Sequence, residues 1–135
     1  MTEENLSIKN KIEHLIEDLR NKIKRKSSNF KEISNLIQKF GLINSWQIVE
    51  PLENLINDNS INVSVVIKVK ILEELGKISD PHVIRVLGSH VSDENKAIRN
   101  AAIKGLSMIK HPKCLPPLLK AIEDEEKWIR IFSIH

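Results

Sequence analysis

The chain has 135 residues, of which 41% are hydrophobic and 29% are charged, and its formal net charge is +3. The hydrophobic fraction suffices for one folded core and excludes a disordered chain, and four Gly, five Pro, three Phe and no Tyr favour an all-α protein over a β-sandwich. Residues 1–60 carry nine charges of each sign and residues 61–135 carry twelve basic and nine acidic ones, so neither half is a polybasic arm.

Residues 5–25 form the first predicted helix, which is amphipathic. Apolar side chains recur on it at spacings of three and four, at Leu6, Ile12, Leu15, Ile16, Leu19 and Ile23. Basic residues gather at 20–26, where cations complement the carboxyl end of the helix dipole. We assign residues 1–29 to this N-terminal helix and expect it to cap the rest of the chain or to dock on a partner.

Residues 30–40 and 48–57 form the next two predicted helices, and Gly41 is the predicted stop of the first. This helix pair matches the following part of the chain at a step of 35 residues, whereas later parts match one another at a step of 31. The four additional residues, 59–62, are therefore an insertion, and a turn between repeats is where such an insertion is tolerated.

From residue 62 onwards the chain repeats itself every 31 residues. Leu75, Ile78, Pro81, Leu87, Asp93, Ile98 and Arg99 return as Leu106, Ile109, Pro112, Leu118, Asp124, Ile129 and Arg130. Each step holds two helical patterns with a turn between them, which is typical of stacked helical hairpins. The repeats of residues 30–135 are predicted at about 30–58, 62–92, 93–123 and, in part, 124–135.

The helices of the later repeats are predicted at 63–77, 81–91, 95–110 and 114–122, with a last helix from residue 126. Prolines stand near the starts of the second helices, where the missing amide costs no hydrogen bond, at Pro51, Pro81, Pro112, Pro116 and Pro117. Because a helix that begins at residue 126 lacks a second helix to pair with, we expect the chain to be a fragment of a longer array.

Asp and Arg recur six residues apart at the junctions between repeats. Asp93 precedes Arg99 and Asp124 precedes Arg130, with each Asp in a predicted turn and each Arg in the helix that follows. Equivalent positions stack in neighbouring repeats, so each carboxylate can accept hydrogen bonds from backbone amides or from an Arg. We predict that these four residues form a structural ladder and are not catalytic.

The repeated pattern resembles HEAT-type repeats. It reads Leu-Gly-x-Ile-x-Asp-Pro at 75–81, Leu-x-x-Ile-x-x-Pro at 106–112, Leu-Pro-Pro-Leu-Leu at 115–119 and Asp-Glu-x-x-x-Ile-Arg at 124–130. Within that class it is most similar to the HEAT-like units of phycobilisome lyases. The resemblance implies an all-α, right-handed α-solenoid of antiparallel helix pairs whose second helices line a concave face.

The sequence lacks the features of the enzymes in this class. Metal-dependent hydroxylases carry repeated His-Glu pairs, and no His is followed by Glu here. DNA glycosylases need a basic cleft with aromatic residues, whereas the predicted concave face has mixed charge. His111 and Cys114 have a spacing that suits metal ligands, but two ligands do not make a site and Cys114 aligns with a predicted core position. We predict no catalytic residue, metal or cofactor.

The cysteine count and the hydropathy bear on location. Cys114 has no second cysteine to form an intrachain disulfide, which fits a reducing compartment. No apolar run is long enough to cross a bilayer, and the polar first residues differ from a secretory leader. These features predict a cytoplasmic protein without a membrane span.

The polar side of the second helices is the predicted partner-binding face. Its residues are Gln47, Glu50, Asn54, His82, Arg85, Ser89, Lys113 and Lys120. The charge along it changes from neutral or acidic to basic, which suits an extended acidic peptide or helix. We predict a non-catalytic protein-interaction or scaffold module that binds a protein partner. The alternatives are a nucleic-acid-binding array that uses Lys113, Lys120 and residues 20–26 on phosphates and, by analogy alone, a bilin-lyase-like enzyme.

Overall fold

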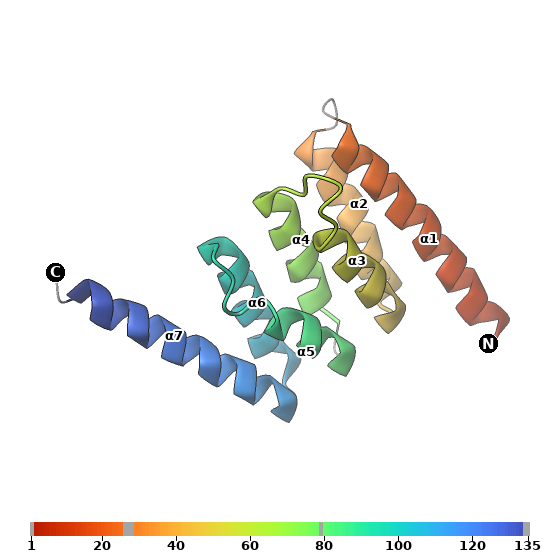
Figure 1. The fold of residues 1–135 in the computed structure, drawn as a ribbon. Coiled ribbons are helices and arrows are strands. Elements are labelled where there is room, and N and C mark those ends of the chain that lie inside the picture. The colour runs from red at the N-terminus through yellow and green to blue at the C-terminus, as the bar shows by residue number, and fades with distance from the viewer. Residues whose placement is uncertain (1, 26–28, 79, 134–135) are drawn as a thin grey trace.

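The computed structural model describes residues 2–25, 29–78 and 80–133, and it describes residues 126–133 by their backbone alone. All regular secondary structure in these residues is helical (Figure 1), which confirms the predicted all-α class. The helices are α1 (Glu3–Lys24), α2 (Phe30–Ile43), η1 (Trp46–Ile48), α3 (Val49–Ile56), α4 (Val65–Gly76), α5 (Pro81–Gly88), α6 (Lys96–Ile109), η2 (Pro112–Cys114) and α7 (Leu115–Ser133), of which η1 and η2 are 3-10 helices.

The helices begin at side-chain caps that recur at the sequence steps of 35 and 31 residues. The caps are Asn29, Ser64 and Asn95 for α2, α4 and α6, and Ser45, Asp80 and His111 for η1, α5 and η2. Each of these side chains accepts a hydrogen bond from an amide that the first helical turn leaves unpaired. The repeat in the sequence is therefore also a repeat of local structure.

The helices pack in chain order (Figure 1). Helix α4 lies between α2 and α6, α1 packs against α2 and α3, and α5 contacts α3, α4 and α6. Two glycines meet where α4 and α6 pack: a Cβ added at Gly76 of α4 would lie 2.9 Å from Gly105 Cα of α6. Because neither residue has a side chain, the two helix backbones can pack directly against each other.

Each of the helices α1 to α6 buries apolar side chains in a shared core. Fully buried members include Leu19, Phe40, Leu52, Leu75, Leu87 and Leu106. In α1, Ile12 and Leu19 are buried, whereas Leu6 of the predicted apolar stripe is 48% exposed. Helix α1 thus packs against the rest of the chain from Ile8 to Ile23, and Leu6 near its start stays exposed.

Gly41 does not end α2, so this prediction is wrong. Helix α2 continues to Ile43 and ends at Asn44, whose φ of 48° lies in the left-handed region that asparagine tolerates. Gly41 instead makes room for Glu74 of α4, because a Cβ at Gly41 would overlap Glu74 Oε2. The Glu74 carboxylate is buried and lies 2.9 Å from Lys77 Nζ.

The predicted break between residues 122 and 126 is also wrong. Helix α7 runs without interruption from Leu115 to Ser133, so Asp124 lies inside a helix and not in a turn. The sequence from Ala121 to Lys127 consists mainly of good helix formers and holds neither Gly nor Pro. Nothing in the local sequence therefore stops the helix where the repeat step placed a turn.

The insertion after α3 is a turn held by Asp58. Its Oδ1 accepts hydrogen bonds from the Ser60 hydroxyl at 2.6 Å and the Ser60 amide at 2.9 Å, and its carboxylate also pairs with Arg20 of α1. The hydrogen bonds from Ser60, together with the Arg20 guanidinium, lower the pKa of Asp58 from 3.8 to about 2. The turn thus joins α1 to the repeats.

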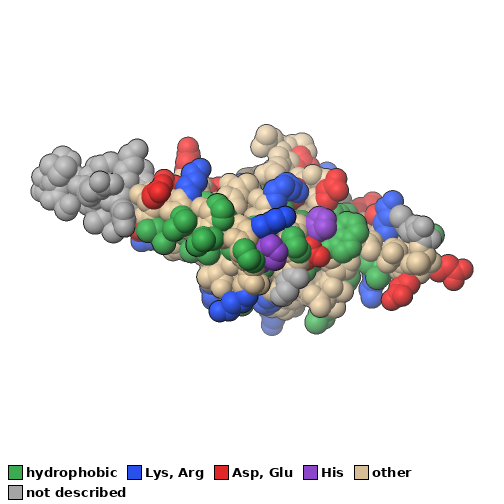
Figure 2. Space-filling model, turned by 90° about the horizontal axis from the view of Figure 1, so that it is seen from below, with side chains coloured by type: hydrophobic (Ala, Val, Ile, Leu, Met, Phe, Trp, Pro, Cys, Tyr) green, Lys and Arg blue, Asp and Glu red, His purple; other side chains and the backbone are tan. Residues whose placement is uncertain are grey.

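Helix α7 carries exposed apolar side chains, and hydrophobic groups gather along it on the underside of the molecule (Figure 2). Leu115 is 58% exposed and Ile122 is 55% exposed. One repeat earlier, the equivalent Ile84 and Val91 are only 7% and 2% exposed. The outer side of α7 is therefore apolar, like a helix surface that packs against the next repeat, and no described helix covers it.

Candidate functional site

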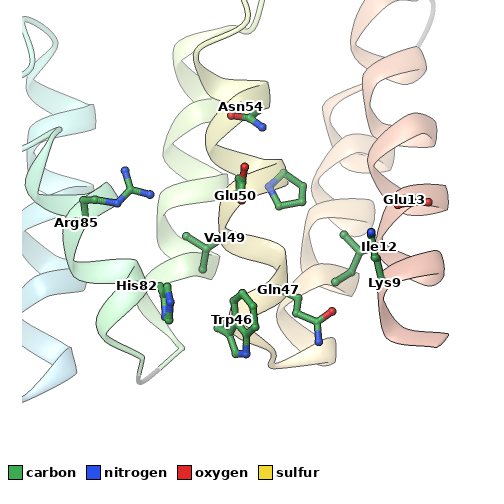
Figure 3. A pocket seen from close by; sticks show the side chains of 11 residues that line it. Lys9, Ile12, Glu13, Trp46, Gln47, Val49, Glu50, Asn54, His82 and Arg85 are labelled. Atoms are coloured by element: carbon green, nitrogen blue, oxygen red, sulfur yellow. The ribbon is translucent and has the colours of Figure 1, made fainter. Parts of the chain in front are cut away.

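A groove runs along η1 and α3, with α1 as one wall and α5 as the other (Figure 3). It encloses about 420 Å³. The residues that line it are Lys9, Ile12 and Glu13 of α1, Trp46, Gln47, Val49, Glu50, Pro51 and Asn54 of η1 and α3, and His82 and Arg85 of α5. The predicted face supplies five of these, Gln47, Glu50, Asn54, His82 and Arg85.

The floor of the groove follows from the local sequence of η1 and α3. Ser45 caps η1 by accepting from the Gln47 amide at 3.2 Å, and the apolar residues that follow turn one side of α3 into the core. Glu50 and Asn54 of α3 stand four residues apart and therefore lie on the opposite side, toward the groove, and Trp46 of η1 lines the groove with them. The indole of Trp46 is 54% exposed, so a large aromatic surface is open to a ligand.

His82 of α5 stacks on Trp46. The two ring centroids are 5.1 Å apart and the ring planes differ by 21°. Asp80 holds this imidazole, because its Oδ1 lies 2.5 Å from His82 Nδ1 and also accepts from the His82 amide at 2.9 Å. These hydrogen bonds, the one from the amide first, lower the pKa of Asp80. One face of the indole is thus fixed by a side chain from the following repeat.

Arg85 does not present a free positive charge to the groove. Its guanidinium binds both carboxylate oxygens of Glu53, with Nη1 2.9 Å from Oε2 and Nη2 3.0 Å from Oε1. The Glu53 carboxylate raises the pKa of Arg85. Such a two-pronged pair satisfies the charge and fixes the position of the guanidinium.

The remaining charges of the groove are Lys9 and Glu13 on the α1 wall and Glu50 on the floor. Neither Glu13 nor Glu50 forms an ion pair with another described side chain. With Glu53 included as the partner of Arg85, the acidic groups are Glu13, Glu50 and Glu53, and the basic groups are Lys9 and Arg85. The groove therefore combines an apolar floor, an exposed indole and a small acidic excess.

Three residues of the predicted face lie outside this groove. Ser89, just after α5, uses its hydroxyl to donate to the Val86 carbonyl oxygen at 2.6 Å. Lys113 of η2 and Lys120 of α7 are exposed and do not line the groove. The predicted continuous face is thus divided between a groove at α1–α5 and separate lysines further along the chain.

The four residues of the predicted ladder have different surroundings. Asp93 accepts from the Asn95 amide at 2.8 Å, while Arg99 donates to the backbone carbonyl oxygen of Asp93 at 2.8 Å and not to its carboxylate. Asp124 accepts from the Ser92 hydroxyl at 2.7 Å. The side chain of Arg130 lies outside the described residues.

Sequence reasoning missed the contributions of Trp46 and α1 to this site. Trp46 had one signal in the sequence, because it stands four residues before Glu50, a residue of the predicted face. Lys9 and Glu13 had none, since the sequence does not show which side of α1 lies beside α3. The pairing of Arg85 with Glu53 likewise depends on the way that α3 and α5 meet.

The described residues also bear on metal binding, membrane spans and the nucleic-acid alternative. They contain no group of three or more His, Cys, Asp or Glu side chains that could hold a metal ion, and none of their helices has the length and hydropathy to span a bilayer. The nucleic-acid alternative relies on residues 20–26 together with Lys113 and Lys120. The carboxyl end of α1 lies at the top of Figure 1, whereas the start of α7 lies at the bottom. Arg20 is paired with Asp58, and Lys26 is outside the described residues. Charges of both signs mix on the underside of the molecule (Figure 2).

Residues 64–134 match the family model for HEAT repeats, which is more than half of the chain. The chain belongs to the HEAT repeat family. The match begins at Ser64, the cap of α4. Helices α1, α2 and α3 of this HEAT repeat protein therefore lie before the matched residues. No curated protein matches the chain in sequence. The match identifies HEAT repeats in general and does not single out the phycobilisome-lyase type.

Proposed function

We propose that this HEAT repeat protein is a non-catalytic interaction module that binds a segment of a partner protein along the groove over η1 and α3. The proposal includes a right-handed solenoid of antiparallel helix pairs, in which α1 takes the place of a preceding layer. The packing of α2, α4 and α6 in chain order and the recurring caps support this arrangement.

The exposed Trp46 in an apolar groove is the observation that supports binding. The exposed Trp46 and the half-buried Pro51 give a ligand apolar area to cover, and tryptophan is enriched among the residues that dominate binding energy in interfaces. The polar residues Gln47 and Asn54 at the sides of the groove can hydrogen-bond the backbone of a bound segment.

Site-specific photo-crosslinking tests the proposal. A photoreactive amino acid replaces Gln47 in the full chain, and a control protein carries it at the exposed Asn100 of α6, outside the groove. In cells of the natural source, we expect a discrete crosslinked protein from position 47 only, and its loss when Trp46→Ala is added. Equal products from both positions, or a product that Trp46→Ala leaves unchanged, would count against the groove.

A further inference from the structure

The charges around Trp46 indicate the chemistry of the bound segment. Arg85, the cation of the α5 wall, is already held by both oxygens of Glu53. Glu50, one helical turn after Trp46, lines the groove without an ion-pair partner among the described side chains. An incoming positive charge would therefore find the Glu50 carboxylate and the exposed indole in one groove. An incoming negative charge would meet a guanidinium that is already paired, and Lys9 on the α1 wall would be the remaining cation.

We infer that the groove selects a partner segment that places a lysine or arginine against Trp46 and Glu50, with aliphatic side chains next to it on the apolar floor. The inference rests on the proposed function and specifies its ligand. It differs from the extended acidic peptide or helix that the sequence predicts for the whole face, because Arg85 is paired with Glu53 and because Lys113 and Lys120 do not line the groove.

Each part of the site has a role in this recognition. The face of the indole attracts a cation through its quadrupole, and stacking on His82 together with the Asp80 hydrogen bonds fixes the orientation of that face. Glu50 of α3, four residues after Trp46 in the chain, lines the same groove and supplies the opposite charge. Trp46 and the half-buried Pro51 supply the accessible apolar surface on which the aliphatic stem or the neighbouring side chains of the segment would pack.

The first experiment is selection of a displayed random peptide library on the full chain, with a parallel selection on Trp46→Ala. We expect peptides with a lysine or arginine beside aliphatic residues, and no enrichment of these peptides on Trp46→Ala. Trp46→Phe keeps an aromatic face and should retain part of the enrichment, and circular dichroism checks that both variants fold. A predominance of Asp and Glu in the selected peptides would overturn the inference and leave the groove as the binding site.

The second experiment measures the contact itself. One selected peptide is synthesised with its basic residue and with an uncharged isostere, citrulline for arginine or norleucine for lysine, and Kd is measured by fluorescence anisotropy. We expect the isostere to weaken binding roughly 3- to 10-fold. Glu50→Gln should weaken the basic peptide by a similar factor but the isostere less than about 2-fold, since the two changes remove the same interaction.

Glu73→Gln is the matched control, because Glu73 is an exposed acid of α4 outside the groove. It should leave both affinities unchanged. Equal weakening by Glu50→Gln and Glu73→Gln would reduce the effect to net charge and overturn the inference. Peptides that bind Trp46→Ala as well as the wild type would contradict the proposed function itself.

Discussion

At the scale of single residues, the close approach of two helix backbones explains why α4 contains Gly76, although glycine has a low helix propensity. Gly76 ends α4 against Gly105 of α6, and an added Cβ would lie 2.9 Å from a backbone atom, which real Cβ atoms do not do. Overlap with backbone cannot be relieved by rotating a side chain. The packing of α4 on α6 therefore requires glycine at this position.

We predict that Gly76→Ala lowers the free energy of unfolding by roughly 1–3 kcal/mol, because α4 and α6 must move apart. Gly88→Ala is the control, since a Cβ there would meet Pro117 at an ordinary distance of 3.6 Å. That change should be neutral or stabilising by up to about 1 kcal/mol, because alanine favours helix more than glycine does. Urea denaturation of both variants measures the two effects, and a stabilising Gly76→Ala would contradict the close approach.

A second prediction concerns the acid range. The pKa of Asp58 is about 2 in the folded chain against 3.8 for the free group, so its stabilisation is present above pH 3.8 and is lost as the pH falls toward 2. Asp58→Asn lacks this contribution at every pH. We expect the stability difference between wild type and Asp58→Asn to shrink between about pH 4 and pH 2 in urea melts.

The same carboxyl group gives an independent readout by NMR. Ser60→Ala removes the hydroxyl hydrogen bond, the largest cause of the lowered pKa, and should raise the pKa of Asp58 toward its usual range. An unchanged carboxyl titration in Ser60→Ala would mean that Ser60 does not set this pKa.

At the scale of elements, α1 belongs to the folded unit through an apolar face that runs from Ile8 to Ile23. Leu19 is fully buried against the repeats, whereas Leu6 is 48% exposed. Leu19→Ala should cost roughly 2–5 kcal/mol and Leu6→Ala less than about 0.5 kcal/mol. Guanidinium melts compare the two. Equally small effects would mean that α1 does not pack on the repeats in solution, and the groove would then lose one wall.

Local signals account for what the sequence predicted about these elements. Caps such as Asp80, prolines such as Pro81 and apolar spacing act over a few residues, so they placed the helices and most core positions. The continuation of α7 past Asp124 was missed because the repeat step was extended over a segment that has no stop signal. The α1 wall of the groove and the pairing of Arg85 with Glu53 were missed, because both depend on contacts between helices that are not adjacent in sequence.

At the scale of the whole molecule, a chain of stacked layers gives equivalent residues unequal roles at its ends. Helix α5 is covered by the layer that follows, and Ile84 is only 7% exposed. Its equivalent one repeat later, Leu115, is 58% exposed because no described layer lies outside α7. In such arrays the stability is close to a sum over layers and their interfaces, so a residue contributes only when its neighbouring layer is present.

This difference yields a prediction with matched positions. Ile84→Ala should lower the free energy of unfolding by roughly 2–5 kcal/mol, since it leaves a cavity between layers. Leu115→Ala, at the equivalent point of the next repeat, should change it by less than about 0.5 kcal/mol, because little apolar area is removed from a packed environment. Both are measured by urea denaturation of the same chain. If Leu115→Ala were as costly as Ile84→Ala, a layer must cover the outer side of α7 in solution.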